Sequence, residues 1–239
     1  MRLTIASLCG LVLLAQQLET RVVEPRHAAS ARDGQELATV IRSAAEIRDV
    51  RISPDGKQIS FSGSPDQLAM MSWLASALDV PADRPGEPLE FVTPGAAGDL
   101  VRVHYLPGMP PSSFQELGTV ARSVSRARRL FTYRPSRAVL VRGTNQEVAL
   151  AGWLIQELQT NPRSARDFAV PGAADDWVRI FPLDPGTTVE RLQALGVAIR
   201  NSLDGTSVHA YSAGKVLVLR DTHARIAEAE RIIACEMTP

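Results

Sequence analysis

Short stretches of this chain alternate between apolar and polar residues, and each is followed by a longer stretch with apolar residues at helical spacing. Residues Val101–Tyr105 alternate in this way, which is typical of a strand with one buried face. Gly108 and the prolines after it interrupt the strand, and Ser112 or Ser113 can cap a helix. The apolar positions of that helix are Leu117, Val120, Ala121 and Val124.

The residues that follow predict a hairpin and a second helix. One strand runs near Leu130–Tyr133, Pro135 turns the chain, and Ala138–Val141 forms the return strand. Gly143 ends that strand and Thr144 lies where the second helix begins. The order of strand, helix, two strands and helix (β-α-β-β-α) predicts a two-layer sandwich with both helices on one face of a small sheet. The apolar positions of the second helix are Val148, Leu150, Ala151, Leu154, Ile155 and Leu158.

The whole pattern repeats along the chain. Residues 35–78 can be laid over residues 115–158 without a gap, and thirteen positions are then identical. A third, more diverged copy lies at a further offset of 78 residues. A fixed period indicates one supersecondary unit repeated along the chain. We therefore predict an α+β protein of three tandem β-α-β-β-α units. Identical pairs include Gln35 and Gln115, Arg42 and Arg122, Gly63 and Gly143, and Trp73 and Trp153.

The repeat also predicts the domain boundaries. We expect repeat units at residues 16–80, 99–160 and 176–236, joined by linkers at 81–98 and 161–175. Both linkers are rich in proline, glycine and alanine and contain the sequence PGAA. A unit of about 60 residues buries too little surface to be comfortably stable alone. We therefore expect neighbouring units to pack on one another.

The amino terminus predicts export. Arg2 provides a positive start, Leu3–Ala15 is apolar, and small residues before Gln16 offer a cleavage site. The apolar run is shorter than the roughly 20 residues that span a bilayer. We therefore predict a signal peptide at residues 1–15 and a mature protein outside the cytoplasm, with an uncleaved anchor as the alternative.

The charge balance argues against nucleic acid as a partner. Lysine plus arginine and aspartate plus glutamate both count 26, so no net field attracts a polyanion. Residues 95–98 have the letters of the GxxG loop of KH domains, which clamps a nucleic-acid backbone. These residues lie in a predicted linker without flanking lysine or arginine. The sequence therefore favours no nucleic-acid function.

Candidate catalytic and metal-binding residues do not cluster in the sequence. Cys9 lies in the predicted signal, which leaves Cys235 alone and excludes a cysteine-based zinc site. The sequence has neither a phosphate-binding loop nor a nucleophile elbow. We therefore predict a protein that is not an enzyme and binds no cofactor or metal. The histidines are scattered singly: His27, His104, His209 and His223.

The repeated unit resembles the short amino-terminal domains of bacterial secretins, the ring-forming outer-membrane channels of secretion and type IV pilus systems. The resemblance rests on a strand written VRVHYL or VRIFPL, a helix with leucine and later arginine, and a return strand written AVLVRGT or KVLVLRD. It implies a β-α-β-β-α fold in the periplasm and side-by-side packing into rings. The chain ends at Pro239 without the β-rich segment that forms the channel, so we expect a ring or adaptor role.

Two sets of recurring residues are candidates for an interface. Trp73 and Trp153 share one position in the second helix of copies one and two, and Arg231 replaces them in the third. They are either core residues or a docking surface between units. The recurring arginines of the first helices are either solvated or bidentate partners of a carboxylate on a neighbouring unit or subunit; they are Arg42, Arg122 and Arg200.

These observations favour an exported protein–protein interaction module, acting as a periplasmic scaffold or adaptor. Its partners would be further copies of itself or proteins of the cell envelope and secretion systems. The alternative is a periplasmic carrier or sensor that binds a small ligand or a peptide.

Overall fold

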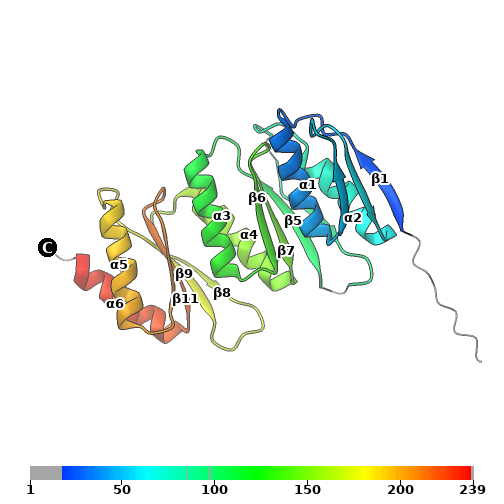
Figure 1. The fold of residues 1–239 in the computed structure, drawn as a ribbon. Coiled ribbons are helices and arrows are strands. Elements are labelled where there is room, and N and C mark those ends of the chain that lie inside the picture. Colours follow the sequence, from blue (N-terminus) through cyan, green and yellow to red (C-terminus); the bar gives the residue numbers. More distant parts are fainter. Residues whose placement is uncertain (1–17, 85, 97, 238–239) are drawn as a thin grey trace, which may run out of the picture.

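Three β-α-β-β-α units follow one another along the chain, as the sequence predicts (Figure 1). The computed structural model describes residues 18–84, 86–96 and 98–237. The predicted signal peptide at residues 1–15 lies outside the described residues.

The first unit shows how local sequence sets the helix ends. The Ser30 side chain accepts a hydrogen bond from the backbone N–H of Asp33 and caps the first helix. Ser64 and Gln67 form a capping box at the start of the second helix. The elements are β1 (Glu19–Val23), α1 (Ala31–Ala45), β2 (Asp49–Ile52), β3 (Ile59–Gly63) and α2 (Pro65–Leu78).

The second and third units repeat this order of elements. Unit 2 contains β5 (Leu100–Tyr105), α3 (Pro111–Ser125), β6 (Arg129–Tyr133), β7 (Ala138–Gly143) and α4 (Asn145–Thr160). Unit 3 contains β9 (Trp177–Pro182), α5 (Val189–Ser202), β10 (Ser207–Tyr211), β11 (Val216–Asp221) and α6 (His223–Met237).

The segments predicted as linkers each contribute one further strand. In residues 81–98, β4 (Leu89–Val92) pairs antiparallel with β5, and in 161–175, β8 (Arg166–Ala169) pairs with β9. Each of these segments therefore belongs to the sheet of the unit that follows it. The strand orders are β1-β3-β2, β4-β5-β7-β6 and β10-β11-β9-β8. Proline- and glycine-rich flanks hid these four-residue strands from the sequence analysis.

The units stack so that sheets and helix pairs alternate as layers (Figure 1). The sheet of unit 2 packs its own helices α3 and α4 on one face, and helices α1 and α2 of unit 1 on the other. The sheet of unit 3 lies in the same way between α3 and α4 and its own helices α5 and α6. Residues of β5 and β7 that pack on unit 1 are Val101, Val103, Tyr105, Ala138 and Leu140.

The stack begins with a polar surface. On the face of the first sheet that points away from α1 and α2, Thr20 and Ser60 stand where unit 2 has the buried Val101 and Leu140. Val22, on the same face, has 58% of its surface exposed. A polar outer face is typical of a repeat that no other repeat covers, and none of the described residues forms a unit over this face.

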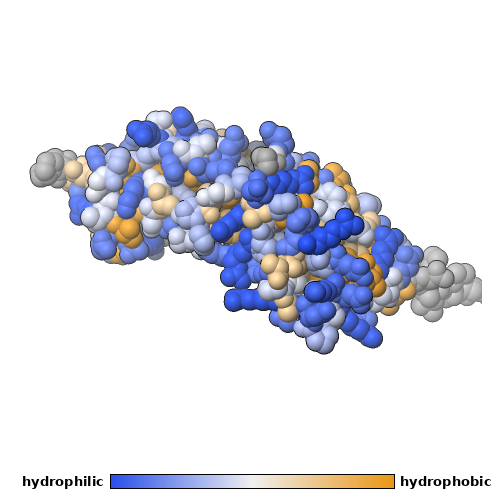
Figure 2. Space-filling view, turned by 90° about the horizontal axis from the view of Figure 1, so that it is seen from above, coloured by the Kyte–Doolittle hydropathy of each residue, from blue (hydrophilic) through white to orange (hydrophobic). Residues whose placement is uncertain are grey.

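The stack also ends with a polar surface. On α6, Glu228 and Glu236 are exposed at the positions where α4 has the buried Leu150 and Leu158. Figure 2 shows a surface that is mostly hydrophilic, with apolar residues in small separate groups. The sequence differences between copies therefore follow from the position of each copy in the stack.

Candidate functional site

A buried arginine locks unit 2 onto unit 1. Arg142 lies at the end of β7 with 5% of its surface exposed. Its Nη1 donates to the backbone carbonyl of Ala44 at the end of α1, and its Nε lies 3.0 Å from a carboxylate oxygen of Asp99. A charged side chain is stable when buried only if its hydrogen bonds are satisfied. The arginine therefore joins the end of one unit's helix to the next unit's sheet.

The same lock recurs between units 2 and 3. Arg220 at the end of β11 donates to the carbonyl of Val124, near the end of α3, at 2.5 Å. Its Nη2 donates to Asp176 at 2.6 Å. Arg142 and Arg220 occupy the same place in their units, and so do their partners. We call each arginine with its carboxylate and its helix-end carbonyl a junction lock.

A glutamate makes a second repeated contact across each junction. Glu36, on α1, accepts hydrogen bonds from the backbone N–H of Arg134 at 3.2 Å and from its guanidinium at 2.7 Å. Glu116, on α3, accepts one from the backbone N–H of Ser212 at 2.8 Å. In both cases a helix of one unit holds the hairpin turn of the next.

The outer units lack the residues that would make these contacts with a further unit. Unit 1 has Ser62 in place of the lock arginine. In its hairpin turn, Pro54 stands where units 2 and 3 have Arg134 and Ser212, whose backbone N–H groups donate to the glutamates. Proline has no backbone N–H to donate. Unit 3 has Ala194 in place of Glu36 and Glu116. In the part of the chain that the structure describes, junctions of this kind therefore form between the three units.

Both tryptophans of the sequence analysis lie at these junctions. Trp73 on α2 packs against Phe91 of β4, with ring centroids 5.4 Å apart. Trp153 on α4 packs in the same way against Phe168 of β8, at 5.2 Å. Each pair joins the second helix of one unit to the added strand of the next. Arg231 takes this position on α6 and is exposed.

Two of the three recurring arginines make hydrogen bonds within their own units. Arg122 donates two hydrogen bonds, at 3.0 and 2.7 Å, to the carbonyl of Leu130 on the edge strand β6. Arg200 likewise donates to Val208 on the edge strand β10, at 2.9 Å. Arg42 is exposed on α1. A role of these arginines at an interface with another chain remains a prediction.

The junction lock of Arg142 and Asp99 predicts a loss of stability in acid. The hydrogen bond from Arg142 holds the pKa of Asp99 below its ordinary value of 3.8, although burial opposes this shift. A carboxyl with a lowered folded-state pKa stabilises the fold above its unfolded-state pKa, and this contribution is lost as the pH falls through the folded-state value. We expect urea unfolding at pH 7, 5 and 3 to show stability falling below about pH 4, and Asp99→Asn to weaken that dependence. Equal pH dependence in both proteins would contradict the lock.

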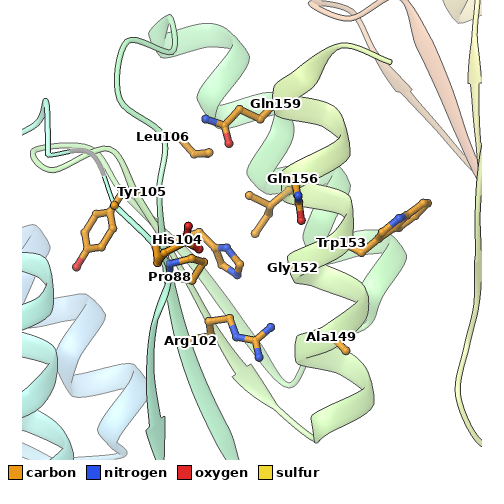
Figure 3. A pocket seen from close by; sticks show the side chains of 13 residues that line it. Pro88, Arg102, His104, Tyr105, Leu106, Ala149, Gly152, Trp153, Gln156 and Gln159 are labelled. Atoms are coloured by element: carbon orange, nitrogen blue, oxygen red, sulfur yellow. The ribbon is translucent and has the colours of Figure 1, made fainter. Parts of the chain in front are cut away.

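A cavity lies between β5 and α4 of unit 2 (Figure 3). It has a volume of about 490 Å³ and is lined by Arg102, His104, Gly152 and Trp153 among others. His104 is 7% exposed, and its Nε2 atom has no hydrogen-bond partner among the described residues. Burial, with a smaller contribution from Arg102, lowers the pKa of His104 to about 4. The imidazole is therefore neutral at pH 7.

In the sequence, His104 is one of four scattered histidines and carries no signal of this cavity. The sequence feature that indicates the cavity is Gly152. The second helices of units 1 and 3 have Ser72 and Glu230 at that position, so only unit 2 lacks a side chain there. An absent side chain opposite a polar strand residue leaves space between the two layers.

The described part of the chain also contains no cluster of three or more residues suited to hold a metal ion. None of its helices has the length and apolarity needed to cross a membrane. Cys235 is exposed on α6.

No protein-family model and no curated protein matches the chain. Several solved structures match. ExeD of Aeromonas hydrophila matches at 14% identity with a TM-score of 0.21, over 93% of this chain and 42% of ExeD. The type II secretion system secretin GspD of E. coli K12 matches at 12% identity with a TM-score of 0.22, over 92% of this chain and 39% of GspD. The structure of XcpQN012 matches at 16% identity with a TM-score of 0.32, over 93% of this chain and 100% of that chain. The chain thus spans about two fifths of the length of ExeD and GspD.

Proposed function

We propose that this protein is an exported, non-enzymatic interaction module that acts as a rigid periplasmic scaffold or adaptor. The proposed location follows from the apolar amino terminus and from the sequence resemblance to secretin amino-terminal domains. The observation that carries the function is the open edge of the first sheet, at β1.

The β1 edge differs from the corresponding edges of the other two sheets. Beyond β5 and β9, strands β4 and β8 complete four-stranded sheets, whereas β1 is the outermost strand of a three-stranded sheet in the described part of the chain. An edge strand presents backbone N–H and C=O groups that can pair with another strand. Val22 on β1 and Leu18 just before it are exposed, at 58% and 73%.

An extended segment of a partner protein fits this edge. Backbone hydrogen bonds would provide affinity, as in other cases of strand addition. In unit 2, β4 adds to β5 with Leu89 opposite Val103, the residue that matches Val22. An apolar residue of the partner would lie beside Val22 in the same way. The rigid stack behind this edge would hold the bound segment at a fixed position.

The test is site-specific photo-cross-linking in the cell envelope. We expect a cross-linking residue at Val22 to give one discrete adduct, with an envelope protein or with a second copy of this chain. The matched control is Arg51, an exposed residue on the opposite edge strand β2 of the same sheet, which should give none. Light scattering on the purified protein separates self-association from binding to another protein. Equal labelling from both positions, or no adduct from Val22, would reject the proposal.

The cavity beside His104 supports the alternative of a small-ligand carrier, and the chemistry of that site is independent of the β1 edge.

A further inference from the structure

A recurring arginine faces the second helix in every unit. Arg21, Arg102 and Arg179 occupy the same place on the first strand of units 1, 2 and 3. In unit 3 the Nε and Nη2 atoms of Arg179 donate to Asp167 on the added strand β8. Its Nη1 atom donates to Glu230 on α6, at 3.0 Å. One arginine thus holds two carboxylates, one from the sheet and one from the helix.

Unit 2 keeps the first of these two carboxylates and lacks the second. The Nε and Nη2 atoms of Arg102 donate to Glu90 on the added strand β4, at 2.9 and 2.6 Å. Glu90 corresponds to Asp167 in the register of the sheet. On α4, however, Gly152 stands where unit 3 has Glu230. A Cβ atom added at Gly152 would lie 3.2 Å from Nη1 of Arg102, so this nitrogen faces the missing side chain.

The cavity borders the place of that missing side chain. In unit 1, Ser72 stands at the same helix position and accepts from Nη1 of Arg21 at 3.2 Å. In unit 2 there is instead a space of about 490 Å³ between Arg102 and α4. Figure 3 shows the guanidinium of Arg102 and the ring of His104 on the side of β5 that faces α4.

His104 provides a second unsatisfied polar group in the same space. Its Nε2 atom is buried without a partner among the described residues and lies 3.4 Å from a Cβ atom added at Gly152. A buried polar atom without a hydrogen bond is costly, so such atoms in native structures call for an explanation. Unit 3 has Phe181 at this position, so the chain places a polar atom only where the cavity is open.

We propose that this cavity binds a small monocarboxylate with an apolar body. The carboxylate takes the position that the Glu230 carboxylate has in unit 3, accepting hydrogen bonds from Nη1 of Arg102 and from Nε2–H of His104. The neutral imidazole supplies this donor in the Nε2–H tautomer. Pairing with Glu90 does not prevent a second anion, because Arg179 binds Glu230 while paired with Asp167.

The rest of the lining selects the body of the ligand. Leu106 and Pro88 offer apolar surface, and the side chains of Gln156 and Gln159 project from α4 (Figure 3). The indole of Trp153 lies on the other side of α4, against Phe168 of β8. Glu87, at the cavity, has an exposed side chain that remains solvated. The walls are polar and apolar in equal share, and polar groups that converge beside apolar surface fit a small ligand with one charged end.

The test uses phenylacetate, hexanoate and acetate as probes, with phenylethylamine and phenylethanol as charge-reversed and neutral controls. We expect the two larger carboxylates to shift the NMR signals of the His104 ring and the Gln156 side-chain amide at pH 7, with dissociation constants on the order of 1 mM for ligands of this size. Acetate should bind more weakly because it lacks the apolar body. Phenylethylamine and phenylethanol should leave both signals in place.

Variants separate the site from general effects on the fold. Arg102→Met and His104→Phe should each weaken phenylacetate binding by about tenfold or more. Arg21→Met, at the matching position of unit 1, should leave it unchanged. Gly152→Glu should abolish binding by supplying an internal carboxylate, with thermal unfolding as the check on folding. The proposal is overturned if no carboxylate shifts the His104 ring, if the amine or alcohol binds equally, or if Arg102→Met leaves the affinity unchanged. None of these results depends on the β1 edge.

Discussion

Replacing Arg142 by methionine is expected to lower the free energy of unfolding by about 3–5 kcal/mol, the usual cost of removing one partner of a buried ion pair. The substitution keeps an apolar side chain of similar length. It leaves the Asp99 carboxylate, whose side chain is 13% exposed, without its arginine. It also removes the donor that satisfies the carbonyl of Ala44. Urea unfolding followed by circular dichroism measures the loss.

Controls for this substitution are available within the same chain. Arg51→Met, at a side chain that is 84% exposed, should change stability by less than about 0.5 kcal/mol. Arg220→Met removes the second junction lock and should cost about as much as Arg142→Met. Adding Asp99→Asn to Arg142→Met should recover part of the loss, because the uncompensated charge is then gone. A loss below about 1 kcal/mol for Arg142→Met would contradict this prediction, because it would show that water replaces the hydrogen bonds from Arg142 to Asp99 and Ala44 at little cost.

The fold of each unit could be predicted from sequence because its signals are local. Alternation at β5, helical spacing at α3 and turn residues before β7 each specify their own element. Because residues 35–78 resemble residues 115–158, the elements predicted for unit 2 could also be assigned to the other copies. Where the local signal was weak, as in β4 and β8, the prediction missed the strand. Those strands exist because a neighbouring strand and a tryptophan of the preceding unit hold them.

The contacts between units could not be derived from the same signals. Arg142 aligns with Arg220 in the third copy but with Ser62 in the first, so a search for residues shared by all copies passes over the junction locks. That search selected Arg42, Arg122 and Arg200 instead. The structure shows two of them supporting an edge strand of their own unit. Each outer copy carries only the half of the junction contacts that faces its neighbour: the third has the lock arginine and lacks the glutamate, and the first has the glutamate and lacks the arginine.

The cavity in unit 2 likewise arises at a position where the three copies differ in sequence. Its signal is one glycine, Gly152, in a helix whose counterparts carry Ser72 and Glu230. The meaning of that difference depends on knowing that Arg102 and His104 lie across from the glycine. This relation is tertiary, because β5 and α4 are separated in sequence by α3 and a hairpin.

The stacked arrangement itself predicts that Val103→Asp will be among the most destabilising single substitutions, with a loss of about 5 kcal/mol. Val103 is fully buried in the core formed with helices of unit 1. An aspartate there would place a charge between two units without a partner, which proteins tolerate very poorly. We expect unit 1 to separate from unit 2, so that chemical unfolding shows two transitions in place of one.

The matched control is Val22→Asp, because Val22 occupies the same place in the register of the first sheet and has no described unit stacked above it. It pairs with Ser60, as Val103 pairs with Leu140, and has 58% of its surface exposed. Its replacement should change stability by less than about 0.5 kcal/mol. Two residues of one type, at one position of one repeat, would then differ in effect by about 5 kcal/mol. Val103 differs from Val22 in its Leu140 partner, in the added strand β4 and in the helices of unit 1 above it, so a difference of that size measures the burial that these contacts provide. Similar effects from both substitutions would instead mean that the units behave as independent domains.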